Sequence, residues 1–89
     1  MMARLTYLAV LEYNGKNGYG VYFPDVLGCI SYGDTVEEAL RMAAEALELH
    51  ISGIIEDGDP LPERTDTIPE LKKGDLVTAI TVDREAVVA

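Results

Sequence analysis

The sequence predicts an α+β domain with the element order βββαβ, in which one long helix packs on a four-stranded sheet. Three observations lead to this class. Apolar and polar residues alternate near the start of the chain, a helical period follows over residues 36–56, and alternation returns over residues 75–83. A chain of 89 residues forms one domain with a thin core, so we expect self-association into a homodimer or homotetramer.

The first strand is predicted over residues 4–13, where every second side chain from Leu5 to Tyr13 is apolar. Leu8 and Val10 make the opposite face apolar as well, so we expect something other than the helix to cover that side. The sequence NGKNG at residues 14–18 accepts positive φ angles. It therefore predicts a hairpin turn into a second strand over residues 19–23.

Short links define the third strand. Pro24 and Asp25 end the second strand, because proline has no N–H for the ladder and fixes its own φ. Gly28 precedes a third strand over residues 29–32, and Gly33 closes it. These links predict that the first three strands follow one another as a meander.

The helix has the clearest boundaries. Thr35 and Glu38 have the spacing of a capping box, and residues 36–56 carry a wide apolar arc suited to lying on a sheet. Asp57 and Gly58 end the helix, and the proline-rich residues 57–74 predict an extended surface connection. If this connection joined parallel strands, the crossover would be right-handed.

The charge of the chain restricts its partners. Sixteen acidic residues against seven Lys and Arg give a net charge of −9 and a pI near 4.3. Such a chain repels phosphate backbones and anionic membranes and attracts a basic protein. We therefore expect no direct nucleic-acid binding by this chain and no membrane association.

The compartment is predicted from two features. Cys29 is the only cysteine, so the chain has neither an internal disulfide nor a cysteine zinc site. The N-terminal stretch MMARLTYLAVLEY is too short and too interrupted for an export signal or a membrane span. We expect a cytoplasmic protein.

Three stretches carry a resemblance to a known family: YFPDVLGC at residues 22–29, GDTVEEAL at residues 33–40 and AAEALELHISGIIEDGDPLP at residues 43–62. With this spacing, residues 5–83 closely resemble the HicB-like antitoxins of type II toxin–antitoxin systems. The resemblance implies a partial ribonuclease-H-like fold. It also implies a partner, the small basic toxin HicA, which cleaves messenger RNA with a histidine and whose active surface the antitoxin covers.

Many members of that family carry a C-terminal DNA-binding domain, and this chain departs from them there. Only REAVVA follows residue 83, which is too short for a helix-turn-helix or a ribbon-helix-helix. We therefore expect one antitoxin-like domain over residues 1–83, followed by a short tail over residues 84–89 without a DNA-binding domain.

A ribonuclease-H-like topology also raises a nuclease hypothesis, which requires carboxylates that converge on divalent ions. The middle of the first strand carries no acid, and the helix glutamates are predicted to face away from the sheet. His50 and Cys29 lie at apolar positions and are better explained by packing. We expect no catalytic residue, no metal site and no cofactor.

The leading hypothesis is a non-enzymatic inhibitor that masks a cationic HicA-type toxin, with recognition centred on the turn after the second strand and on the helix start. The alternative is a stand-alone oligomeric module that binds a protein or a ligand without a toxin partner. Asp25 could instead fix its own turn, and the tyrosines could simply pack across strands. The candidate partner-binding residues are Tyr22, Asp25, Tyr32, Asp34, Glu37, Glu38 and Glu45.

Overall fold

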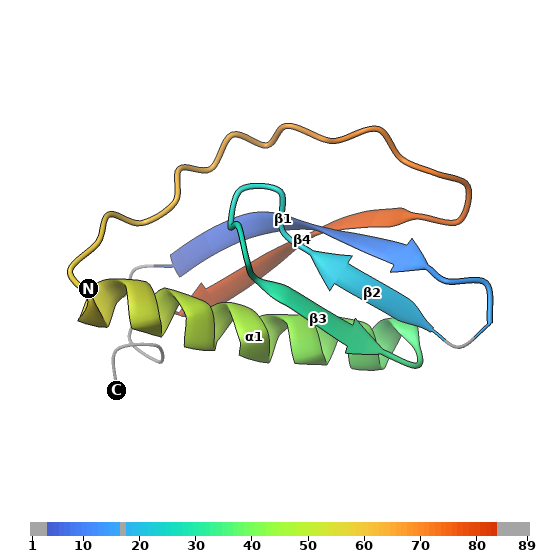
Figure 1. Ribbon diagram of the computed structural model, residues 1–89, viewed down its shortest axis with the longest axis horizontal. Coiled ribbons are helices and arrows are strands. Elements are labelled where there is room, and N and C mark those ends of the chain that lie inside the picture. Colours follow the sequence, from blue (N-terminus) through green and yellow to red (C-terminus); the bar gives the residue numbers. More distant parts are fainter. Residues whose placement is uncertain (1–3, 17, 84–89) are drawn as a thin grey trace.

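The computed structural model describes residues 4–16 and 18–83, and it shows one helix packed on a four-stranded antiparallel sheet (Figure 1). The predicted tail at residues 84–89 lies outside the described residues. The predicted class and element order are confirmed, and no boundary differs from its predicted position by more than one residue. The elements are β1 (Arg4–Tyr13), β2 (Tyr19–Tyr22), β3 (Ile30–Gly33), α1 (Val36–Glu56) and β4 (Leu76–Asp83).

The strand order is β3-β2-β1-β4, and all three pairings are antiparallel. A parallel crossover is therefore absent among the described strands, and the right-handed connection considered above does not arise. The reason is the connector, which we define as residues 57–75. It runs back along the length of α1, so β4 starts near the end of the molecule where α1 started (Figure 1).

The core lies between α1 and one face of the sheet. Its largest buried side chains include Phe23, Leu11, Leu47 and Ile51, each at most 2 % exposed. The fully buried helix residues recur every fourth position, which is the stripe that the helical period predicts: Ala39, Ala43, Leu47 and Ile51. Alanines occupy the N-terminal half of this stripe, so the start of α1 can approach the sheet closely.

Two glycines permit the closest backbone contacts. A Cβ added to Gly33 would lie 2.2 Å from the backbone nitrogen of Ala39. A Cβ added to Gly18, whose φ is +118°, would lie 2.3 Å from the carbonyl oxygen of Gly33. The hairpin turn, the end of β3 and the first turn of α1 therefore meet at one point where only glycine fits.

The hydroxyl half of the predicted capping box is confirmed at the start of α1, and the carboxylate half is shifted by one residue. Thr35 Oγ1 accepts a hydrogen bond from the Glu38 backbone N–H at 3.1 Å. Glu38 Oε1 accepts one from the backbone N–H of Asp34 at 2.8 Å, one residue before the cap. The two side chains thereby fix the path from β3 into the helix.

Removing this cap should destabilise the domain moderately. Thr35→Ala leaves the Glu38 N–H without its acceptor, so we expect a loss of about 1 kcal/mol in the free energy of unfolding. Denaturant titration followed by circular dichroism measures it. Thr35→Ser retains the hydroxyl, so its free energy of unfolding should stay close to that of the parent protein. Equal losses in the two variants would contradict the capping role.

The face of the sheet turned away from α1 is also partly apolar, as the sequence predicts. Val10 is fully buried there, with Tyr22 and Val77 paired beside it on the neighbouring strands. The connector runs along this side of the sheet (Figure 1). Ile30, at the β3 edge, remains 72 % exposed.

Candidate functional site

The connector is attached to the rest of the domain by side-chain hydrogen bonds. The Asp25 carboxylate accepts from the Thr65 backbone N–H at 2.8 Å and from Thr65 Oγ1 at 2.7 Å. Nearer α1, Tyr7 Oη donates to the carbonyl of Pro62 at 2.7 Å, and Leu61 packs against the core. These contacts hold a segment without regular secondary structure in a defined path.

The alternative role considered for Asp25, a hydrogen bond that fixes its own turn, is wrong. Backbone bonds shape that turn, from Val26 N–H to the Phe23 carbonyl and from Cys29 N–H to the Val26 carbonyl. The carboxylate of Asp25 instead reaches a residue 40 positions away. Local sequence could not show this, because the acceptor and donor meet only after the connector folds back.

Acidification should release this attachment. The hydrogen bonds from Thr65 lower the pKa of Asp25 below its ordinary value of 3.8. Because the folded-state pKa is the lower one, the stabilisation is present above the unfolded-state pKa and is lost as the pH falls through the folded-state pKa. An NMR titration should show Asp25 and the Thr65 amide changing together, with a midpoint below 3.8.

The matched variant for this titration is Asp25→Asn, in which the Thr65 amide should no longer respond over that pH range. A midpoint at or above 3.8 in the parent protein would contradict the attachment described here, and so would an unchanged Thr65 response in the variant.

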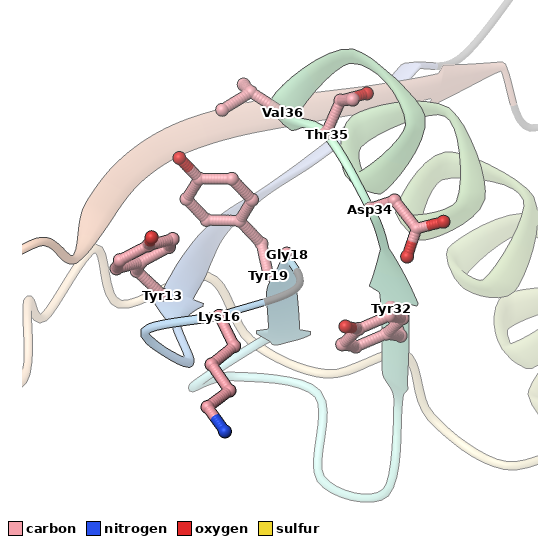
Figure 2. Close-up of a pocket in the computed structure, with 8 residues that line it drawn as sticks. All are labelled: Tyr13, Lys16, Gly18, Tyr19, Tyr32, Asp34, Thr35 and Val36. Carbon is pink, nitrogen blue, oxygen red and sulfur yellow. The ribbon is translucent and has the colours of Figure 1, made fainter.

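A separate open groove of about 850 Å³ lies beyond the N-terminus of α1 (Figure 2). One wall comes from the β1–β2 hairpin and the other from the junction between β3 and α1. Tyr13 and Tyr19 are paired in the sheet; Tyr19 packs against the core, whereas Tyr13 is exposed. The groove is lined by Tyr13, Lys16, Gly18, Tyr19, Tyr32, Asp34, Thr35 and Val36.

The groove gathers part of the predicted contact set. Tyr32 and Asp34 line it, and Glu37 and Glu38 follow on the first turn of α1. Glu38 is already engaged in the cap and lies 3.9 Å from Arg41 in an exposed ion pair. The helix start therefore presents several acids beside aromatic rings.

The other predicted contact residues lie elsewhere. Tyr22 pairs with Val10 on the opposite face of the sheet, Asp25 holds the connector, and Glu45 is exposed farther along α1. Burial raises the pKa of Tyr22, with further contributions from Glu12 and Asp75, so this face also carries negative charge. The seven residues thus do not form one surface.

Sequence reasoning missed Tyr13 as a groove residue. Its alternation assigns it to the core face, and it is nevertheless 47 % exposed. The available signal was the register of the hairpin, which places Tyr13 opposite Tyr19 at the end of β1.

Within residues 4–16 and 18–83, no three His, Cys, Asp or Glu side chains lie close enough to hold a metal ion. Cys29 is buried, and burial raises the pKa of its thiol, so it stays protonated as a core side chain. His50 is half-buried near Gly28. In the same described part, no helix is long and apolar enough to cross a membrane.

A family model described as the HicB-like antitoxin of bacterial toxin–antitoxin systems matches residues 7–87. The chain belongs to the HicB-like antitoxin family. The resemblance stated from the three sequence stretches is therefore confirmed, and the match extends from β1 through β4.

Two relatives illustrate the range of the family. An uncharacterised 14.9 kDa protein of Haemophilus phage HP1 is 44% identical over 73 residues, which are 76% of this chain and 54% of that protein. Antitoxin HicB 1 of Photorhabdus laumondii is 37% identical over 62 residues, which are 70% of this chain and 40% of that protein. The matched region thus spans about half of these relatives or less.

Solved antitoxin structures share the fold. A toxin–antitoxin complex from Streptococcus pneumoniae superposes with a TM-score of 0.81 at 21% identity, covering 98% of this chain and 74% of that one. The N-terminal domain of Burkholderia pseudomallei HicB superposes with a TM-score of 0.71 at 27% identity, covering 89% of this chain and 99% of that one. A chain of a HicA3–HicB3 complex superposes with a TM-score of 0.61 at 24% identity, covering 84% of this chain and 94% of that one.

Proposed function

We propose that this chain is an antitoxin that binds a small, basic HicA-type toxin and masks its active surface. The observation that carries the proposal is the family match over residues 7–87. Two of the structures with the same fold are complexes of a toxin with its antitoxin, which supports a protein partner for this chain. The chain acts by covering a surface and not as an enzyme.

The charge of the chain supplies the physical basis for this binding. A net charge of −9 attracts a basic protein and raises its association rate, while buried aromatic and apolar contacts set most of the affinity. The same charge opposes direct binding of this chain to nucleic acid. The exposed acids and tyrosines at the start of α1 offer both kinds of contact to a protein.

The test combines the purified chain with a purified small, basic toxin of the HicA type. We expect the two to co-purify, and excess antitoxin to stop RNA cleavage by the toxin. The association rate should fall steeply as salt is added, because screening weakens the steering. Unimpeded RNA cleavage in a large excess of this chain would overturn the proposal.

Self-association is a second part of this proposal. The small core and the exposed Ile30 and Tyr32 on the sheet support a homodimer or homotetramer. Light scattering at micromolar concentration measures the mass, and a monomer would contradict this part alone. An oligomer that binds no toxin would favour the stand-alone module.

A further inference from the structure

The three most exposed large apolar side chains of the described chain gather around one edge of the sheet. They are Leu27 at 87 %, Leu49 at 78 % and Ile30 at 72 %. Leu27 lies in the loop before β3, Ile30 begins β3, and Leu49 lies on α1. A Cβ built on Gly28 would lie 3.6 Å from His50 Cε1, so this loop and the middle of α1 lie side by side. A group of neighbouring exposed apolar residues marks an interaction surface.

β3 is an edge strand, because it pairs with β2 alone. An edge strand directs every second backbone N–H and C=O away from its neighbour, and proteins protect such edges with charged residues or proline. Residues 26–33 contain neither. The opposite edge strand, β4, buries Ile80 and Val82 and carries one exposed large apolar side chain, Leu76, among its eight described residues. The β3 edge is therefore the more open to a second strand.

α1 carries an apolar stripe beside this edge. Its members have the three- and four-residue spacing of one helix face: Met42, Ala46, Leu49 and Gly53. Ala46 and Gly53 lie one turn before and one turn after His50, which neighbours the loop before β3, so the stripe lies on the β3 side of the helix. A Cβ added to Gly53 would meet nothing within 4 Å. Two large and two small side chains alternate, so an antiparallel copy of this helix can pack large against small.

The charge of the chain indicates which molecule fits this surface. Two copies with a net charge of −9 repel each other over most of their surfaces. The uncharged residues 26–33 are where they can approach with little repulsion, and exposed Glu45 borders the helix stripe on the side away from β3. A basic partner would gain more at the acidic surfaces.

We propose that a second copy of this chain docks here, with β3 pairing antiparallel to β3 of that copy and the two α1 stripes packed against each other. A two-fold axis perpendicular to the sheet beside β3 brings each element onto its own copy in antiparallel orientation, which is the symmetry of most homodimers. The two four-stranded sheets then join into one sheet with both helices on the same face. This inference rests on the self-association part of the proposed function and names its surface.

The first test places the same charge at the two edges of the sheet. Ile30→Lys and Leu49→Lys put an ammonium group into the contact, so each should weaken self-association at least about tenfold in sedimentation velocity over a range of concentrations. Leu76→Lys makes the same change on β4, at the opposite edge, and should associate as the parent protein does. All three side chains are exposed, and circular dichroism of each variant verifies that it is folded.

The second test locates the contact without a substitution. Hydrogen exchange of the amides in residues 30–33 should slow as the concentration of the parent protein rises, because strand pairing protects outward N–H groups. Exchange in residues 76–83 should not change with concentration. Added salt should strengthen self-association, since screening reduces the repulsion between like charges, whereas it should weaken toxin binding.

The outcomes separate this inference from the proposed function. A monomeric parent protein at micromolar concentration would overturn the β3 contact and the self-association on which it rests, but not the masking of a toxin. Unchanged self-association in both Ile30→Lys and Leu49→Lys would overturn the β3 contact alone. Variants that keep their mass but lose toxin binding would assign this surface to the toxin, which also overturns the inference.

Discussion

Phe23→Ala should remove about 3–5 kcal/mol from the free energy of unfolding. Phe23 is 2 % exposed and is the largest of the fully buried side chains in the described chain. It follows β2 and contributes to the core between the sheet and α1. Truncation removes most of its buried apolar surface and leaves a cavity that the surrounding strands and helix can close only in part.

An effect of this size matters more in a small domain than in a large one. Domains are stable by about 5–15 kcal/mol, and small cores lie near the lower end of that range. We therefore expect Phe23→Ala to be substantially unfolded at ambient temperature, as measured by denaturant titration. Phe23→Leu keeps most of the side-chain volume, so its loss in the free energy of unfolding should be clearly smaller. Equal losses in the two variants would argue against a cavity as the cause.

Gly33→Ala should be among the most damaging single-methyl changes in the described chain. The added Cβ would lie 2.2 Å from the Ala39 nitrogen and 2.5 Å from the Ala39 Cα. Both are backbone atoms of the first helical turns, so no side-chain rotation can relieve the clash. Overpacking costs about 1–3 kcal/mol where side chains can shift, and we expect a loss at or above the upper end of that range.

Gly20 provides the matched control, because it lies in β2 and an added Cβ there meets nothing within 4 Å. Gly20→Ala should therefore leave the free energy of unfolding nearly unchanged, whereas Gly33→Ala should lower it strongly and shift α1 away from β3. Similar melting temperatures for the two variants would show that the close contact between β3 and α1 is wrong.

The groove and the connector lie at opposite ends of α1, and different contacts hold each of them in place. At its start, the glycines bring the hairpin turn and the β3–α1 junction together, and this approach forms the walls of the groove. Past its end, Asp25 and Tyr7 hold the returning chain. The backbone of the groove walls is therefore fixed by close contacts.

Local sequence determined the elements of this domain. Alternation in residues 4–13, the NGKNG turn, Pro24 and the pair Thr35 and Glu38 each act through contacts within a few residues. That is why every predicted element is present and no boundary moves by more than one residue. The family, too, follows from short stretches with characteristic spacing.

Only the tertiary structure decided the direction of β4, the role of Asp25 and the make-up of the groove. Each depends on residues that are distant in sequence. The connector sets where β4 begins, Thr65 donates hydrogen bonds to the Asp25 carboxylate, and the hairpin meets the helix start. A pattern with a period of two or 3.6 residues reports which face a side chain occupies. It does not report where the neighbouring helix begins. Tyr13 stays exposed although its face of the strand is the one that packs against α1.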